Sequence, residues 1–175
     1  MFAIAKSNLR ASQDAQASIS GLFDQKTLTM PFSVGLTQNG TEFYLRAKQL
    51  TRENNSGPQQ NYIMEQVEIT LRDLNQMTTN ILSDLGTLNA DRTTAALQGD
   101  VKASTSEGHI FEAELLTANL NLGSAHAEGS IKIRDNQTTI FSERMDVDNF
   151  GTASTIYFFS GGVRAIYFNK QSTSQ

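Results

Sequence analysis

The chain has no cysteine, two histidines (His109 and His126) and two prolines among its 175 residues. Without cysteine it can build neither a disulfide framework nor a thiol nucleophile nor a cysteine-ligated metal site. Neither histidine stands in a spaced metal-binding motif, so we expect both to have structural or solvent-facing roles. Phosphate-binding glycine loops, the G-x-S-x-G elbow and H-E-x-x-H are also missing. We therefore predict a protein that is not an enzyme and uses no cofactor and no metal.

Charge is scarce as well, because charged residues make up 18% of the chain and the net charge is −4. No cluster of lysine and arginine is available to neutralise a run of phosphates, which argues against a nucleic-acid binder. No apolar run reaches the roughly 18 residues of a membrane-spanning helix. The chain is instead rich in threonine, serine, asparagine and glutamine, a composition typical of antiparallel sheets with one solvated face.

Short strand signals recur every 8–12 residues from Leu28 to Phe168, separated by turn-forming glycine, asparagine and aspartate. This spacing predicts an all-β sandwich, jelly roll or barrel. Pro31 places its neighbours at a sheet edge. Residues 63–85 have apolar spacings that fit a helix, but residues 67–72 alternate as a strand does. We predict strand there because both flanking regions are β-like.

Parts of the sequence repeat. The pattern from Gly40 through Phe43, Leu45 and Ala47 to Leu50 returns from Gly108 to Leu120, and the spacing of Leu97-x-Gly99-x-Val101 returns in Phe159-x-Gly161-x-Val163. These echoes indicate stacked β-turn-β layers that share one apolar interior.

Alternation within the expected strands predicts an apolar inner face. Glu112 and Glu114 should face outward, Asp100 should occupy a turn or bulge, and Gly161-Gly162 should form a bulge that redirects the last strand. An inner face of this kind is either an ordinary filled core or a slot that holds a lipid chain. The lipid-binding residues predicted on it are Phe43, Leu45, Ala47, Leu97, Val101, Phe111, Ala113, Leu115, Ile131, Ile133, Phe141, Met145, Val147, Phe159 and Val163.

Several motifs in this order resemble the LptC family of lipopolysaccharide export, especially its alphaproteobacterial members. Phe2-Ala3-Ile4-Ala5 resembles the end of that family's single membrane helix. The other matching pieces are Leu28-Thr29-Met30-Pro31, the strand from Gly40 to Ala47, Gly86, Leu97-x-Gly99-Asp100-Val101, Thr105-Ser106-x-Gly108 and Gly161-Gly162-Val163-Arg164. The resemblance covers about residues 2–168, and its L-x-G-D-V…T-S-x-G piece is shared with the periplasmic bridge protein LptA.

The resemblance implies a single antiparallel β-jelly roll, open and hollow, whose interior receives the acyl chains of lipopolysaccharide. It implies that residues 1–21 are the end of a membrane anchor and a linker, 22–168 the periplasmic roll and 169–175 a polar tail. It also implies docking of the N-terminal end on the LptB/LptF/LptG transporter of the inner membrane. The LptA-like bridge protein would add to a C-terminal edge strand formed by Val163, Arg164, Ala165, Ile166, Tyr167 and Phe168.

Two rival interpretations remain open at this point. The chain could be a soluble bridge protein like LptA, since the full membrane helix is absent from the sequence. It could also be a structural or adhesive β-domain with a filled core and no ligand. A polysaccharide-cleaving β-helix fits poorly, because no carboxylate pair is expected to face inward.

Overall fold

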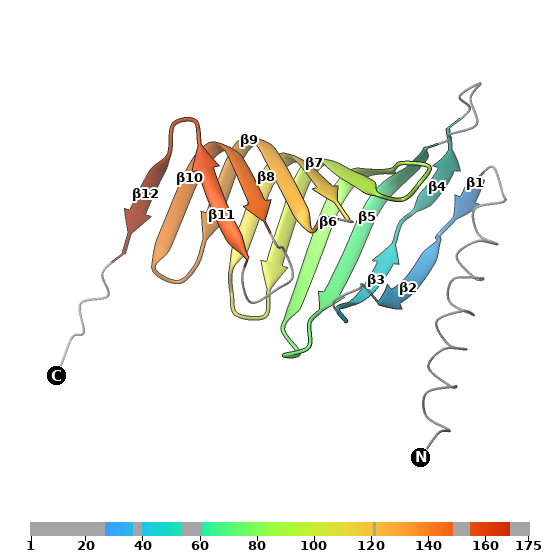
Figure 1. Cartoon of the computed structure of the whole chain (residues 1–175), viewed down its shortest axis with the longest axis horizontal. Coiled ribbons are helices and arrows are strands. Elements are labelled where there is room, and N and C mark those ends of the chain that lie inside the picture. Colours follow the sequence, from blue (N-terminus) through green and yellow to red (C-terminus); the bar gives the residue numbers. More distant parts are fainter. Residues whose placement is uncertain (1–26, 37–39, 54–60, 121, 149–154, 169–175) are drawn as a thin grey trace, which may run out of the picture.

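The computed structural model describes residues 27–36, 40–53, 61–120, 122–148 and 155–168, and these form one twelve-stranded sheet without a helix (Figure 1). Every strand pair in it is antiparallel. The strands are β1 (Thr27–Thr29), β2 (Phe32–Leu36), β3 (Glu42–Arg46), β4 (Gln49–Arg52), β5 (Tyr62–Arg72), β6 (Thr78–Leu88), β7 (Thr94–Thr105), β8 (Ile110–Asn119), β9 (Ser124–Arg134), β10 (Thr138–Asp148), β11 (Ile156–Ser160) and β12 (Arg164–Tyr167).

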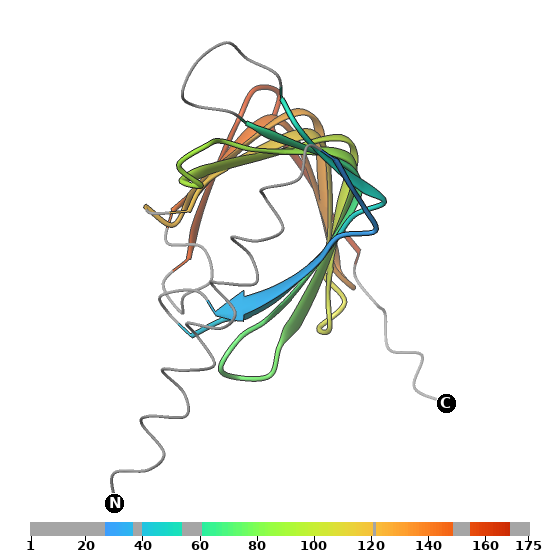
Figure 2. The same ribbon diagram turned by 90° about the vertical axis from the view of Figure 1, so that its right-hand side faces the viewer.

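The sheet is open and follows the order of the chain. Its order runs β1-β4-β5-β6-β7-β8-β9-β10-β11, with β2 and β3 continuing the β1 and β4 end and β12 pairing with β10. Figure 2 shows that the strands curl around a common axis, as in a jelly roll that is not closed. The predicted all-β, antiparallel, jelly-roll-like fold is therefore confirmed.

Residues 63–85 form two strands, β5 and β6, joined by a turn, so the strand prediction is confirmed and the helix alternative is wrong. Pro31 lies between β1 and β2, each of which has a single partner strand in the sheet, as predicted for an edge. The predicted N-terminal anchor and linker and the predicted polar tail lie outside the described residues.

Aspartates close several of the hairpins by accepting hydrogen bonds from backbone N–H groups. Asp73 Oδ1 accepts from Asn75 and Met77 between β5 and β6, at 2.9 and 2.8 Å. Asp135 Oδ1 accepts from Gln137 and Thr138 between β9 and β10, both at 2.7 Å. Such bonds hold a tight turn and thereby fix the register of the two long strands that the turn connects.

Two kinds of strand alternate through the sheet. We call the first kind small-residue strands: β3 with β4, β6, β8 and β10. Each carries an inward residue (Leu45, Ile81, Phe111 or Ile140), a small buried residue two positions later, and a second inward residue three positions after that. The small buried residues are Ala47, Ser83, Ala113 and Ser142.

The other kind we call positive-φ strands: β1 with β2, β5, β7, β9, and β11 with β12. Each bends at a residue of positive φ. These bend residues are Met30, Gln66, Gly99 with Asp100, Gly129, and Gly161 with Gly162, with φ between 44° and 83°. Leu97-x-Gly99-x-Val101 is thus repeated by Ala127-x-Gly129-x-Ile131 as well as by Phe159-x-Gly161-x-Val163. The similar patterns found in the sequence therefore belong to a longer structural repeat. Its unit is a hairpin of one positive-φ strand and one small-residue strand, about 30 residues long.

The bends are packed against acidic side chains of the preceding strand. A Cβ placed on Gly129, where φ is +83°, would lie 2.6 Å from the Glu114 side chain, and Ser130 donates to Glu114 Oε1 from its backbone N–H and its hydroxyl. Gly99 with Asp84 and Gly161 with Glu143 repeat this arrangement. At these three positions only glycine fits, because both the backbone angle and the space are unavailable to a side chain.

We therefore expect Gly129→Ala to lower the free energy of unfolding by about 2–4 kcal/mol, from backbone strain plus the clash with Glu114. Gly108→Ala is the matched control, because Gly108 has φ +89° but no atom within 4 Å of the added Cβ. Its cost should be the backbone term alone, about 1–2 kcal/mol. Urea unfolding of both variants measures the difference, and equal losses would show that the Glu114 contact does not shape the bend.

Candidate functional site

The inner, concave face of the sheet carries a continuous row of apolar residues from one edge to the other. We call it the Leu45 row. Cα pairing across successive strands joins Leu45, Ile69, Ile81, Ala103, Phe111, Ile133 and Ile140, with Ser33 of β2 and Ala165 of β12 at its two ends. All members of this row within β3–β10 are half-buried, so their side chains keep surface that a ligand can cover.

A second row, the Leu50 row, runs beside the first along the same face. Its members are Leu28, Leu50, Met64, Gly86, Leu97, Leu116, Ala127, Met145 and Phe159, again paired strand by strand. Gly86 leaves room here for its neighbours: the nearest atoms to a Cβ on it are Val67 Cγ2 at 2.8 Å and Met64 Cε at 3.3 Å. This row is more deeply buried than the Leu45 row, so it forms the packed part of the interior.

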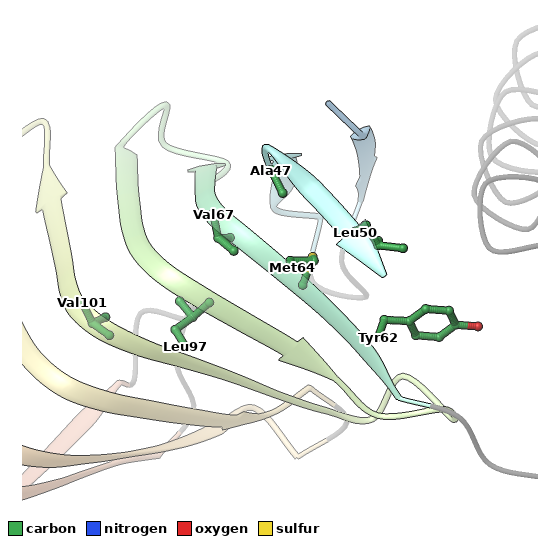
Figure 3. Packing of buried hydrophobic residues seen from close by; sticks show 7 residues of the cluster. All are labelled: Ala47, Leu50, Tyr62, Met64, Val67, Leu97 and Val101. Carbon is green, nitrogen blue, oxygen red and sulfur yellow. The ribbon is translucent and has the colours of Figure 1, made fainter. Parts of the chain in front are cut away.

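Further buried residues lie between the two rows. They are Ala47 and Ala113 of the small-residue strands, and Val67, Val101 and Ile131, which follow the bends of β5, β7 and β9. Figure 3 shows seven buried residues of the first core cluster following one another across neighbouring strands. Phe111 and Leu116 pack against this cluster and against the second one, which contains Ala127, Ile131 and Met145. The two clusters are therefore joined into one apolar inner face.

Most of the residues predicted to bind lipid lie on this face. Leu45, Phe111 and Ile133 belong to the Leu45 row, and Leu97, Met145 and Phe159 to the Leu50 row. The remaining inward residues of the prediction are Phe43, Ala47, Val101, Ala113, Ile131 and Val147.

Two predicted residues lie on the outer face instead, because β-bulges shift the alternation. Leu115 pairs with exposed Gln98 and Glu128, and its neighbour Leu116 takes the inward position. Phe141 pairs with Lys132 and lies under the Arg164 guanidinium, whose carbon is 4.6 Å from the ring centre. Its neighbour Ile140 occupies the inner row.

Val163 is separated from the other predicted residues. It follows the bend at Gly161 and Gly162 and is 52% exposed, at the free edge of the sheet. β12 follows it and pairs with β10 only, so the predicted partner-binding residues Arg164, Ala165, Ile166 and Tyr167 form an edge strand, and Phe168 follows directly. The predicted bulge at Gly161-Gly162 is present as two residues of positive φ.

Several inner residues were not predicted from the sequence. Leu28, Met64, Val67, Ile69, Ile81, Leu88, Leu116 and Ile140 all lie on the inner face or pack against its core. The strand repeat is the signal that could have identified them. When the strands are aligned at their bends, each of these residues occupies the same position as a predicted lipid-binding residue of another strand.

The outer face is charged. Lys132 Nζ lies 3.6 Å from Glu112 Oε2, and Lys102 Nζ lies 2.8 Å from Asp100 Oδ2. Glu112 and exposed Glu114 face outward as predicted, and Asp100 lies at the bend of β7. The sheet therefore separates an apolar inner face from a polar outer one, as is common in antiparallel sheets with one solvated face.

His126, on the outer face of β9, lies between two carboxylates. Its Nδ1 is 2.6 Å from Asp146 Oδ1 and its Nε2 is 3.0 Å from Glu128 Oε1. Hydrogen bonds to Glu128 and then Asp146 raise the pKa of His126 above its usual 6.5. A raised pKa in the folded state means that the histidine stabilises the fold below pH 6.5, and that this stabilisation is lost as the pH rises through the raised pKa.

We expect the free energy of unfolding of the native chain, relative to His126→Asn, to be highest in mild acid and to decline toward alkaline pH. The effect should stay below about 1 kcal/mol, because the group is partly exposed and screened by solvent. Denaturant unfolding of both proteins at several pH values measures it. A difference that grows as the pH rises would contradict the assigned pKa direction.

Comparison with known proteins gives one family. A family model described as "LptC: Lipopolysaccharide-assembly, LptC-related" matches residues 33–167, which covers β2 from its second residue through β12. A search of curated proteins finds no match. No helix among the described residues is long and apolar enough to cross a membrane. The match spans most of the chain and the whole Leu45 row, so the chain belongs to the LptC family, a periplasmic, inner-membrane-associated family that serves lipopolysaccharide transport and is not a family of enzymes.

Proposed function

We propose that the chain receives lipopolysaccharide from an inner-membrane ABC transporter of the LptB/LptF/LptG type and passes it to a periplasmic β-roll bridge protein. The acyl chains travel along the inner face of the sheet. The observation that carries the proposal is the Leu45 row, which is apolar and half-buried on β3 and on every strand from β5 to β10.

The energetics explain why such a face is needed. Removing a lipid methylene from water stabilises it by roughly 0.8 kcal/mol, so a 12-carbon chain left in water forgoes about 10 kcal/mol. A continuous apolar row lets the chain move from one strand to the next without re-exposing that surface. Because no residue of the row is charged, no step along it requires an ion to be desolvated.

The two ends of the sheet give the transfer its direction in this proposal. β1 and β2 form the N-terminal edge and would dock on the transporter, next to a membrane anchor in residues 1–21. β11 and β12 form the C-terminal edge and would accept a strand of the bridge protein, since an edge strand offers free N–H and C=O groups to a partner. A shared sheet would make the two inner faces continuous.

An apolar fluorescent probe tests lipid binding directly. We expect the delipidated protein to enhance the probe's emission and purified lipopolysaccharide to displace it, whereas a domain with a filled core gives neither signal. Displacement by lipopolysaccharide but not by its delipidated polysaccharide would support binding through the acyl chains. A protein that binds no probe and no lipopolysaccharide would contradict the proposal.

A further inference from the structure

The C-terminal edge of the sheet is the positive-φ strand formed by β11 and β12. On its outer side it lacks the small-residue strand that follows the other positive-φ strands from β5 onward. Within the sheet each positive-φ strand from β5 onward is followed by a small-residue strand: β5 by β6, β7 by β8, and β9 by β10. β11 and β12 together repeat the pattern of β7 and β9, with Phe159, Gly161, Val163 and Ala165 at the corresponding places. Among the described residues, no small-residue strand follows them.

The exposure of the apolar residue that follows each bend measures what is missing at the edge. Val67, Val101 and Ile131 stand at the same place in β5, β7 and β9 and are 2%, 0% and 1% exposed. Each is paired with a small residue of the next strand, namely Ser83, Ala113 and Ser142. Val163 occupies this place at the edge and is 52% exposed. A strand with a small residue opposite Val163 would bury it as its equivalents are buried.

Charge gives a second, independent indication. The residue after this apolar residue is Lys102 in β7, Lys132 in β9 and Arg164 in β12. Glu112 of β8 is paired with both lysines, and its carboxylate lies 3.6 Å from Lys132 Nζ. Arg164 lies over the Phe141 ring on the β10 side, while its other side faces the free edge. Each of the two lysines has one apolar and one acidic cross-strand neighbour, because Lys102 is also paired with Leu82 and Lys132 with Phe141. Arg164 already has its apolar neighbour, so an acidic residue on the incoming strand would give it the same two kinds of neighbour.

We propose that the C-terminal edge selects its partner by this pattern: an antiparallel small-residue strand with an apolar residue opposite Ala165, an acidic one opposite Arg164, a small one opposite Val163 and an apolar one opposite Phe159. The inference rests on the proposed function, because the partner strand belongs to the bridge protein. It adds the sequence rule by which that strand is chosen and the register in which it pairs.

A second copy of this chain does not satisfy the rule. Among the described residues, the two edges of its sheet are β1 with β2 and β11 with β12, and both are positive-φ strands. Pairing β12 with the β1 and β2 edge of another copy would set Val163 against the Pro31 region instead of a small residue, and Pro31 has no N–H to donate. The edge is therefore suited to a different protein.

Disulfide trapping tests the register, and the absence of cysteine from the chain makes it specific. The probe is a synthetic peptide with the sequence of residues 110–119, which is the small-residue strand β8. One peptide carries Ala113→Cys, and two controls carry Glu112→Cys or Glu114→Cys. Each is mixed in excess with the full chain carrying Val163→Cys under mild oxidation. Directly opposed residues of antiparallel strands have Cα atoms about 4.5–5.5 Å apart, within the range for a disulfide.

We expect the Ala113→Cys peptide to form the mixed disulfide at least about tenfold faster than either control peptide. Replacing Glu112 of that peptide with lysine should slow the reaction, and Arg164→Glu in the chain should restore it. Equal rates for the three peptides, no mixed disulfide with any of them, or a preference for disulfides between two Val163→Cys chains would overturn the inference. If the native chain still captures the bridge protein in that case, the strand rule fails while the proposed function stands.

Discussion

Phe111→Asp should weaken lipopolysaccharide binding at least tenfold in the probe-displacement assay. Phe111 is half-buried in the middle of the Leu45 row and packs against both core clusters, so an acyl chain moving along the face must pass it. An ionised carboxylate there costs several kcal/mol unless it is paired, and each 1.4 kcal/mol is a factor of ten in affinity. Its cross-strand neighbours are Ala103 and Ile133, which offer no countercharge.

Leu115→Asp is the matched control, because it places the same charge on the same strand but on the outer face beside Gln98 and Glu128. It should bind lipopolysaccharide like the native chain. Thermal melting curves must show both variants folded, and Ile133→Asp repeats the test at the neighbouring position of the row. Folded Phe111→Asp and Ile133→Asp proteins with native affinity would place the lipid path elsewhere.

Ala165→Pro should reduce capture of the bridge protein by the immobilised chain at least tenfold. The Phe168 N–H donates to Gln137 O of the turn before β10, at 2.7 Å, so the N–H groups of Ile166 and Arg164 point toward β10 as well. By the alternation of an antiparallel ladder, the N–H groups of Ala165 and Tyr167 point to the free edge. Proline at position 165 therefore removes a donor that the partner strand needs and leaves the bonds to β10 in place.

Ala165→Gly is the control for this change, since it removes the side chain but keeps the N–H, and it should capture the bridge protein at close to native strength. Ile166→Pro should weaken β12 itself, because it removes a bond to β10. Lipopolysaccharide binding by the isolated Ala165→Pro protein should be nearly unchanged. If Ala165→Pro captures the bridge protein as well as Ala165→Gly does, the docking edge is not β12.

The strands could be predicted because alternation, turn residues and the edge position of Pro31 are local signals. Even residues 63–85, whose spacing also fits a helix, resolve into β5 and β6 once the alternation of 67–72 is given weight. The repeat was visible at Leu97 and Phe159, where large residues precede the glycine. Its copy from Ala127 to Ile131 is harder to recognise in the sequence, because alanine gives a weaker apolar signal than leucine or phenylalanine.

The inner face could be predicted only up to the bulges. A period of two places Phe111, Ala113 and Leu115 on one face, but register shifts in the pairing of β8 with β7 and β9 turn Leu115 outward and Leu116 inward. Phe141 illustrates a second difficulty: its size favoured burial, yet the ring packs under Arg164 on the outer face while Ile140 faces inward. Bulges depend on how two strands meet, and a single strand's pattern does not contain that information.

The central claim is that acyl chains lie on the inner face, and neighbouring residues of β10 test it most directly. A photoreactive phenylalanine analogue is placed at Ile140, in the Leu45 row, or at Phe141, on the outer face. After irradiation with purified lipopolysaccharide, we expect a cross-linked product from position 140 and little from position 141. Equal cross-linking at the two positions, or a product from position 141 alone, would contradict it.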